Sequence, residues 1–280
     1  MFRHALQGIH SPAENRALLQ FLGAYLSSPL ARFFLFHTTS SWEVGRAKVH
    51  LEELLTLPFP LPEDTKDPKG ARRIATQVGT LMDDAMEHAS QPIVDRRSVV
   101  EVARCEITPL IYEYFDVDET ERVAIEDTNE IIIPSTRPTN AASTLATLKH
   151  PSAAAQAEYI DTLTSTLNHW ARGGPQRVSG RSMTAVWSGV GAVELRRFGG
   201  AEPSRPAGDD KELLATLERL RNVYRKQLGS VELLRGLKVF HEDTLYLFKP
   251  LQMRFWTRTA ALNDADSIAA SILSSPLEAR

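Results

Sequence analysis

Prolines at positions 58, 60, 62 and 68 constrain the fold of the first half of the chain more than any other feature. Proline lacks a backbone N–H and fixes φ, so neither a regular helix nor a strand ladder continues through such a stretch. The prolines therefore predict a boundary between a short N-terminal segment and a longer run of sequence that follows.

The N-terminal segment predicts two helical runs and a loop. Residues 15–26 place leucines and a tyrosine at helical spacing. A break at 27–29 follows, and its proline suits the first turn of a new helix. Residues 30–36 are too apolar to be exposed, and their spacing fits either a buried helical turn or a core strand. Residues 38–45 are expected to form a loop.

Residues 67–133 predict a block of three helices with acidic faces. Apolar residues recur at helical spacing over 67–89 and over 95–115, with a bend expected near Pro109. The third helix is expected over 118–132. Asp118 and Glu121 there form the capping pair that is typical of a helix N-terminus.

The second half predicts a linker and then a small unit of mixed structure. Residues 134–151 contain Ser, Thr, Pro and Ala without a strong period and are interpreted as the linker. The expected elements after it are a helix over 152–171, strands over 177–178 and 184–197, a loop over 199–208, a helix over 209–228, a hairpin of 234–240 with 244–248, and a terminal helix over 264–273 capped by Asn263 or Asp264.

Composition restricts the compartment and the chemistry. No apolar run approaches the ~20 residues of a membrane span, and the first residues lack a secretory apolar stretch. The single cysteine, Cys105, excludes an internal disulfide and a multi-cysteine zinc site, and we expect it to be buried in a helix. These features predict a cytoplasmic protein with no membrane partner.

Charge is distributed unevenly along the chain. The net charge of −3 does not itself indicate nucleic-acid binding. Residues 1–140 carry 14 Lys and Arg against 21 Asp and Glu, whereas residues 141–280 carry 18 against 14. A basic second half is compatible with contacts to phosphate groups.

One polar loop combines the side chains that read DNA. Arginine pairs with guanine, Ser and Thr reach base edges or phosphates, and an aromatic ring can stack or wedge. The candidate DNA-binding residues of this loop are Thr38, Thr39, Ser40, Ser41, Trp42, Arg46 and Lys48. The alternative is a polar loop in which Trp42 plugs the edge of a core.

A second set of candidate DNA-binding cations lies in the C-terminal unit, interleaved with aromatic residues. Strand alternation is expected to place many of these cations on one face of a sheet, where they could follow a phosphate backbone. The alternative is a solvated sheet face. The set comprises Arg177, Arg181, Arg196, Arg197 and Lys238.

The order of motifs over residues 15–75 resembles the target-recognition region of adenine-N6 DNA methyltransferases from restriction-modification systems. In that family a helix ending in Leu-x-Ser-x-Leu, a Trp-containing loop and a Leu-Pro-Phe/Ile-Pro terminator recur together. Here the three patterns are filled by Leu26, Ser28 and Leu30, by Trp42 and Arg46, and by residues 57–62. The loop departs from the common Trp-Gly-x-Glu-Arg form, because its glycine is Gly45.

The resemblance implies a fold and a set of partners. We expect an α+β chain with a helical N-terminal half that includes a short recognition unit, and a small α+β C-terminal unit. The expected domains are a target-recognition-like unit over 1–66, a helical spacer over 67–133, the linker over 134–151 and the C-terminal unit over 152–280. The implied partners are double-stranded DNA and a catalytic methyltransferase or restriction subunit, which would bind S-adenosylmethionine.

Catalytic motifs are absent from the sequence. An adenine-N6 methyltransferase needs an Asn/Asp-Pro-Pro-Tyr/Phe loop, and the chain contains no Asn-Pro-Pro or Asp-Pro-Pro. The only Gly-x-Gly after an apolar stretch, at 189–191, leads into strand-like sequence and not into the helix that a cofactor turn requires. Asp83, Asp84 and His88 share one helix but are interpreted as a solvated face. We therefore predict no catalytic, cofactor-binding or metal-binding residue in this chain.

Three functions remain open from the sequence. The first is the DNA sequence-recognition, or specificity, part of an adenine-N6 methyltransferase or restriction-modification system. The second is a non-catalytic helical scaffold or assembly protein of a defence operon, which the acidic helices over 67–133 favour. The third is an enzyme of an unrecognised type.

Overall fold

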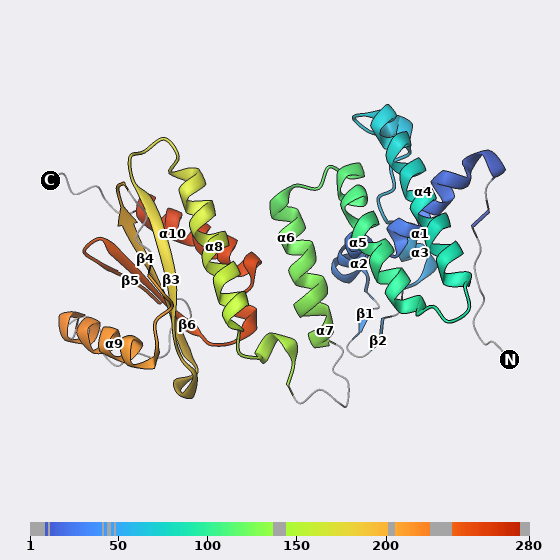
Figure 1. Cartoon of the computed structure of the whole chain (residues 1–280). Helices are drawn as coiled ribbons and strands as arrows, with labels where there is room; N and C mark the ends of the chain where they lie inside the picture. The colour runs from blue at the N-terminus through green and yellow to red at the C-terminus, as the bar shows by residue number, and fades with distance from the viewer. Residues whose placement is uncertain are drawn as a thin grey trace. The chain divides into compact units, whose positions relative to one another are not determined.

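The chain divides into two compact units, Met1–Arg137 and Pro138–Arg280 (Figure 1). The computed structural model describes residues 9–10, 12–40, 42–43, 46–47, 49–136, 144–200, 205–224 and 237–274. The boundary between the units falls within the stretch interpreted as a linker. Each unit is considered separately below.

The first unit is helical apart from one short hairpin. Its elements are η1 (Ala13–Asn15), α1 (Arg16–Leu26), α2 (Pro29–Thr38), β1 (Trp42–Glu43), β2 (Arg46–Ala47), α3 (Leu51–Leu54), η2 (Pro62–Asp64), α4 (Pro68–Ser90), α5 (Arg96–Tyr114), α6 (Glu119–Asp127), the π-helical turn η3 (Thr128–Ile132) and α7 (Ile133–Thr136). The apolar run over 30–36, which could have been helix or strand, is part of helix α2.

The helices begin where short polar side chains can cap them. The Ser28 hydroxyl accepts a hydrogen bond from the backbone N–H of Ala31 at 3.2 Å, and proline occupies the first position of α2. Asp67 caps α4 in the same way. Asp118 and Glu121 form the predicted reciprocal capping pair at the start of α6.

One hydrophobic core holds the first unit together. Phe21 and Tyr25 of α1 are fully buried against α4 and α5, and the Phe21 ring lies 4.3 Å from that of Tyr114. Phe59, from the proline-rich stretch, packs on the same two α1 rings. The Tyr114 hydroxyl donates to the carbonyl oxygen of Pro60 at 2.8 Å. Helices α1, α2, α4 and α5 and the proline-rich stretch therefore share a single core.

One detail of this unit differs from the sequence expectations. Helix α5 continues through Pro109 to Tyr114 as one element, as expected. Cys105 is exposed on that helix, so the prediction that it is buried was wrong. The aliphatic face of α5 instead turns Ile107 and Ile111 inward.

No single helix among the described residues is long and apolar enough to cross a membrane. The stretch Ala13–Leu26 together with α2 passes a length and composition test as a pair, with a bend of 58° between them. The pair contributes Phe21, Tyr25, Ala31 and Leu35 to the core of the first unit.

The second unit is a sheet covered by helices on both faces. Its elements are η4 (Ala146–Leu148), α8 (Ala153–Trp170), β3 (Arg177–Ala185), η5 (Val186–Ser188), β4 (Val190–Phe198), α9 (Asp210–Tyr224), β5 (Leu237–His241), β6 (Thr244–Pro250), η6 (Met253–Phe255) and α10 (Arg258–Ser274). The observed fold is thus α+β, as expected, with a helical N-terminal half.

Two strand and helix boundaries were predicted wrongly. Residues 184–197 are not one bent strand, because β3 ends at Ala185 and the chain turns back through η5 into β4. Gly189, at the end of that turn, has a φ of 66°, which glycine adopts without strain. Helix α10 begins at Arg258, six residues before the expected start, and the Thr257 hydroxyl accepts from the N–H of Ala260.

The sheet is antiparallel with the strand order β3-β4-β6-β5. One face carries Val193, Leu195, Leu245 and Leu247 and packs on α8 and α10 (Figure 1). The opposite face carries Met183, Ala192, Tyr246 and Phe248 and packs on Leu213 and Leu220 of α9. The second unit therefore has two cores, one on each side of the sheet.

Two strand glycines permit close packing on the α8 and α10 face. A Cβ atom at Gly191 would lie 2.5 Å from Cζ2 of Trp256, which is itself fully buried. A Cβ atom at Gly180 would lie 2.9 Å from side-chain atoms of Leu195 and of Thr164 in α8.

Candidate functional site

The predicted recognition loop begins with residues that terminate α2. The hydroxyls of Thr38 and Thr39 donate to the carbonyl oxygens of Phe34 and Leu35 at 2.8 and 2.7 Å. These bonds satisfy carbonyl groups that the end of a helix leaves without partners. Thr38 and Thr39 therefore hold the helix end from which the loop departs.

Glu53 of α3 holds both ends of the loop. One carboxylate oxygen accepts from the backbone N–H and the hydroxyl of Ser40, at 2.9 and 2.8 Å. The other accepts from the backbone N–H of His50 at 3.0 Å. Ser40 precedes β1 and His50 follows β2, so one side chain fixes the separation of the two flanking positions.

Between these positions the chain forms a two-stranded antiparallel hairpin. Trp42 pairs with Ala47 and Glu43 pairs with Arg46. The expected loop is therefore a small β-ribbon between α2 and α3. Ser41 and Lys48 lie outside the described residues, as do the side chains of Trp42 and Arg46.

The candidate cations of the second unit do not share one sheet face. Strand pairing places Arg196 opposite Ser179 and Arg181 opposite Glu194, on the face covered by α9. Lys238 pairs with Leu247, which belongs to the other face. Arg197 is the neighbour of Arg196 in β4 and therefore lies on the opposite face of the sheet, the same face as Lys238. Arg177, Arg181 and Arg196 thus share the face covered by α9, whereas Arg197 and Lys238 lie on the other face, so many but not all of the candidate cations share one face.

Three of these cations are engaged within the fold. The Arg177 guanidinium donates to backbone carbonyls at the end of α8 and in the following turn, including that of Gly174 at 2.8 Å. The Lys238 ammonium donates to the carbonyl of Ser267 at 2.8 Å and to the hydroxyls of Ser267 and Ser271. Arg197 forms an exposed ion pair with Asp243.

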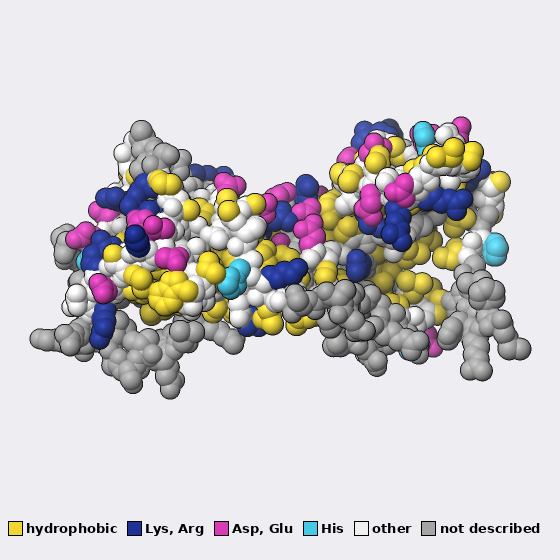
Figure 2. All heavy atoms as spheres, turned by 60° about the horizontal axis from the view of Figure 1, so that its bottom comes forward, with side chains coloured by type: hydrophobic (Ala, Val, Ile, Leu, Met, Phe, Trp, Pro, Cys, Tyr) yellow, Lys and Arg dark blue, Asp and Glu magenta, His cyan; other side chains and the backbone are white. Residues whose placement is uncertain are grey.

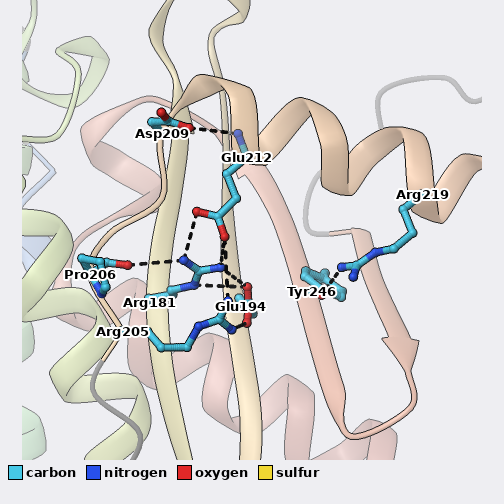
Figure 3. Close-up of polar contacts among 8 residues, drawn as sticks. All are labelled: Arg181, Glu194, Arg205, Pro206, Asp209, Glu212, Arg219 and Tyr246. Atoms are coloured by element: carbon cyan, nitrogen blue, oxygen red, sulfur yellow. Dashed lines mark hydrogen bonds and ion pairs between the residues drawn. The ribbon is translucent and has the colours of Figure 1, made fainter.

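Arg181 is the centre of a buried ion network (Figure 3). Its guanidinium donates to the Glu194 carboxylate at 2.7 Å and to the Glu212 carboxylate, which reaches down from α9. Arg205 binds the second oxygen of Glu194. The side chains of Arg181 and Glu194 are only 9% and 7% exposed, so this network belongs to the interior.

The network shifts the ionisation of its members. Burial would lower the pKa of Arg181, but hydrogen bonds to Glu212 and Glu194 outweigh it and raise that pKa above its ordinary value. The hydrogen bond from Arg181 lowers the pKa of Glu212 below the ordinary value. The charged forms of Arg181 and Glu212 are therefore both favoured.

A polar cavity of about 410 Å³ opens beside this network. It lies between α9 and the sheet, and its lining includes Arg196, Arg205, Arg219, His241 and Thr244. Arg219 of α9 donates to the Tyr246 hydroxyl at 2.6 Å, and its guanidinium lies 5.7 Å from the centre of that ring (Figure 3). Four arginines, Arg181, Arg196, Arg205 and Arg219, line this cavity.

Lys249 is a further cation of β6 and is buried beneath α10. Its ammonium donates to Asp264 at 2.5 Å and lies 4.1 Å from the centre of the Tyr159 ring. Burial lowers the pKa of Lys249, partly offset by Asp264. Burial also raises the pKa of Tyr159 well above its ordinary value. With its side chain only 5% exposed, Lys249 does not reach an external phosphate.

Cations are interspersed with anions on the described surface. On the face shown in Figure 2, Lys and Arg side chains alternate with Asp and Glu over both units. Asp83 is paired with Arg16 at 2.7 Å, and His88 bonds the carbonyl of Asp84 at 2.7 Å. Within the described ranges no group of three or more His, Cys, Asp or Glu side chains is arranged to hold a metal ion.

Sequence reasoning missed the residues that complete the cavity. Arg205 and Arg219 were not among the candidates, although Glu212, Thr216 and Arg219 recur at helical spacing on one face of α9. That polar stripe, on a helix whose other positions bury leucines, was the available signal. Which strand position it would face could not be read without the sheet order.

Comparison with known proteins gives no relative from which a role could be transferred. No family model matches the chain, and no match was found among curated proteins or solved structures.

Proposed function

We propose that this chain is the DNA sequence-recognition, or specificity, component of an adenine-N6 DNA methyltransferase or restriction-modification system. It acts with a separate catalytic partner, and S-adenosylmethionine binds to that partner. The catalytic subunit takes the target adenine out of the duplex, while this chain selects where that happens.

The observation that carries the proposal is the β1–β2 ribbon held at both ends by Glu53. A two-stranded β-ribbon fits the major groove, where base edges present a distinct pattern for each pair. Specific readout needs its side chains positioned in advance, because a loop that orders only on binding loses affinity to the ordering entropy. Anchoring on α2 and α3 supports such positioning.

The exposed cations of the second unit supply contacts to the DNA backbone in this proposal. Arg196 is exposed and has no ion-pair or hydrogen-bond partner among the described residues. Arg197 is exposed and paired only at the surface, with Asp243. Arg181 and Lys238 are excluded from the contact set because each is committed to the interior or to α10.

A salt-dependent binding experiment tests the division of labour. The chain is combined with its catalytic partner, and isotherms are measured on preferred and scrambled duplexes at several salt concentrations. Arg46→Ala should cost about 1–3 kcal/mol on the preferred duplex only. Arg196→Ala should weaken binding to both duplexes alike and reduce the salt slope by about one. If the two variants behave identically, Arg46 and Arg196 do not have separate roles in reading bases and in binding phosphates.

Glu53 offers a sharper test of the ribbon itself. Glu53→Gln keeps the shape of the side chain but removes the charge that accepts three hydrogen bonds. Discrimination between the duplexes should fall, since the ribbon loses its fixed base. Glu52→Gln is the matched control, because Glu52 is exposed on the same helix. Equal discrimination by both variants would contradict the ribbon proposal.

A second candidate function, a non-catalytic scaffold of a defence operon, is favoured by a different feature. An apolar groove of about 250 Å³ lies between α1, α4 and α5, lined by Met82, Ala85, Val99 and Ala103 among others. Met86 and Val100, which also line it, are more than half exposed. Such grooves accept apolar side chains of partner helices. If the chain with its partner does not retard duplex DNA in a gel-shift assay at low salt, the scaffold function replaces DNA recognition as the proposal.

A further inference from the structure

The lining of the cavity beside α9 carries more arginines than carboxylates. Its buried carboxylate, Glu194, is neutralised by Arg181 and Arg205, and Glu212 also binds Arg181. Arg196 and Arg219 then remain, and neither has a carboxylate partner among the described residues. The remaining acidic side chain of the lining, Glu242, is exposed in the β5–β6 turn.

The two arginines come from different layers and converge on one space. Arg196 extends from β4, and Arg219 extends from α9, which covers the same face of the sheet. The Tyr246 hydroxyl and ring hold the Arg219 guanidinium, so its remaining donors are positioned before any ligand arrives. Arginine donors in a fixed fork match the oxygens of a phosphate group.

The cavity selects an anion and not a base. Its volume of about 410 Å³ is within the range of small-ligand sites, ~300–1,000 Å³. Of the two rings in the described lining, that of Tyr246 is only 4% exposed and the other is the imidazole of His241. Arginine donors and the hydroxyl-bearing Thr244 outnumber these rings, so the lining suits the oxygens of a phosphate better than the face of a nucleobase.

We infer that this cavity is a phosphate-binding site built around Arg196 and Arg219. The same chemistry would accept a phosphodiester of a nucleic-acid backbone or the free phosphate group of a small molecule. The inference goes beyond the proposed function, because it places a defined anion site in the second unit and does not depend on the β1–β2 ribbon.

Inorganic phosphate is the first probe, applied to the full chain by calorimetry and by thermal unfolding. Phosphate should bind, and the unfolding midpoint should rise with the logarithm of the phosphate concentration once that concentration exceeds the dissociation constant. Arg196→Gln and Arg219→Gln should each weaken binding about tenfold or more, the loss expected for one charge-assisted contact. Arg221→Gln is the control: it is exposed on α9 two positions from Arg219, on another face of the helix.

Arg196→Gln is the decisive variant because the Arg196 side chain is exposed and makes no described ion pair or hydrogen bond within the fold. Circular dichroism checks that Arg219→Gln is folded, and if it is not, Arg196→Gln decides alone. Phosphate binding equal to wild type in Arg196→Gln, or a wild type that does not bind phosphate, would overturn the inference.

A second arm with a scrambled DNA duplex identifies the source of the phosphate. If Arg196→Gln weakens both phosphate and duplex binding, the site takes a backbone phosphodiester. If it weakens phosphate binding alone, the site takes a small phosphorylated molecule, and the inference holds without the DNA proposal. The Arg46 and Glu53 variants report on the ribbon separately, so the two ideas can fail independently.

Discussion

Arg181 links three elements through one guanidinium. It extends from β3, binds Glu194 of β4 and Glu212 of α9, and is almost fully buried. Replacing one member of a buried ion pair is costly, because the partner charge remains in a medium that solvates it poorly. The network therefore fixes α9 over the sheet and with it the wall of the cavity.

Arg181→Met should lower the free energy of unfolding by about 3–5 kcal/mol. The buried Glu194 carboxylate would lose one of its two arginine partners, and only Arg205 would remain to pair with it. Denaturant unfolding of the full chain measures this loss. Arg205→Met is the comparison, because Arg205 is 40% exposed and its pairing is partly screened. Its loss should be about 1 kcal/mol or less. Equal losses would mean that burial of Arg181 does not govern the network.

Lys249 should make stability depend on pH in the alkaline range. Its pKa in the folded chain is lowered from 10.5, so the unfolded chain binds more protons between the two values. Stability therefore rises as pH increases through the folded pKa toward 10.5. The unfolding free energy of wild type minus that of Lys249→Met should increase from pH 7 to pH 9.5. This range ends about half a unit below the ordinary pKa of tyrosine, so Tyr159 does not titrate within it in the unfolded chain. A flat difference would contradict the shift.

At the scale of the element, the turn between α4 and α5 carries backbone strain. Ile93 has a φ of 82° and is fully exposed. A β-branched residue is disfavoured there, because its Cβ clashes with the backbone in the left-handed region. The exposed side chain gains no packing to offset that cost within the described unit.

Ile93→Asn should raise the free energy of unfolding by about 1 kcal/mol, since asparagine tolerates the left-handed region. Val100→Asn is the matched control: it removes an exposed apolar side chain from α5, where φ is helical. Thermal unfolding of both variants separates relief of strain from a general effect of polarity. A midpoint for Ile93→Asn at or below that of wild type would rule out the strain.

Elements with a clear period could be predicted from the sequence, and those set by distant contacts could not. Helices α1, α4 and α6 follow from apolar spacing and from caps such as Asp67 and Asp118. The start of α10 was misplaced because Asp264 looks like a cap. In the structure Asp264 lies inside the helix and accepts from Lys249 and Tyr159, residues far away in sequence.

The same limit applies to the candidate site. The polar segment over 38–48 is local, so its composition could be read from the sequence, whereas helix α3, which holds its far end, was not expected. The roles of Arg181 and Arg196 could not be distinguished, because both are strand arginines of one face. Glu212, which is thirty-one positions from Arg181 in sequence, binds Arg181 in the interior, whereas Arg196 stays exposed.

At the scale of the whole molecule, the division into two units predicts where a protease acts first. Initial cleavage of the full chain should fall within 134–151 or 199–208, since these stretches join compact units or elements. Residues 67–89 should resist, because α4 buries Ile74 and Val78 in the first core. Time-resolved digestion with mass spectrometry provides the measurement. Early cleavage within 67–89 would contradict the assignment of that core.

The strand order of the sheet also implies a sequence of events during folding. Strands β3 and β4 are neighbours in the chain, as are β5 and β6, so each pair can form as a local hairpin within about 1–10 μs. The central pairing of β4 with β6 joins segments separated by α9, and loop entropy must be lost before that contact forms. The refolding rate of this unit should therefore be set by how soon Val193 meets Leu247, and mutations at that pair should slow refolding more than mutations at the outer edges.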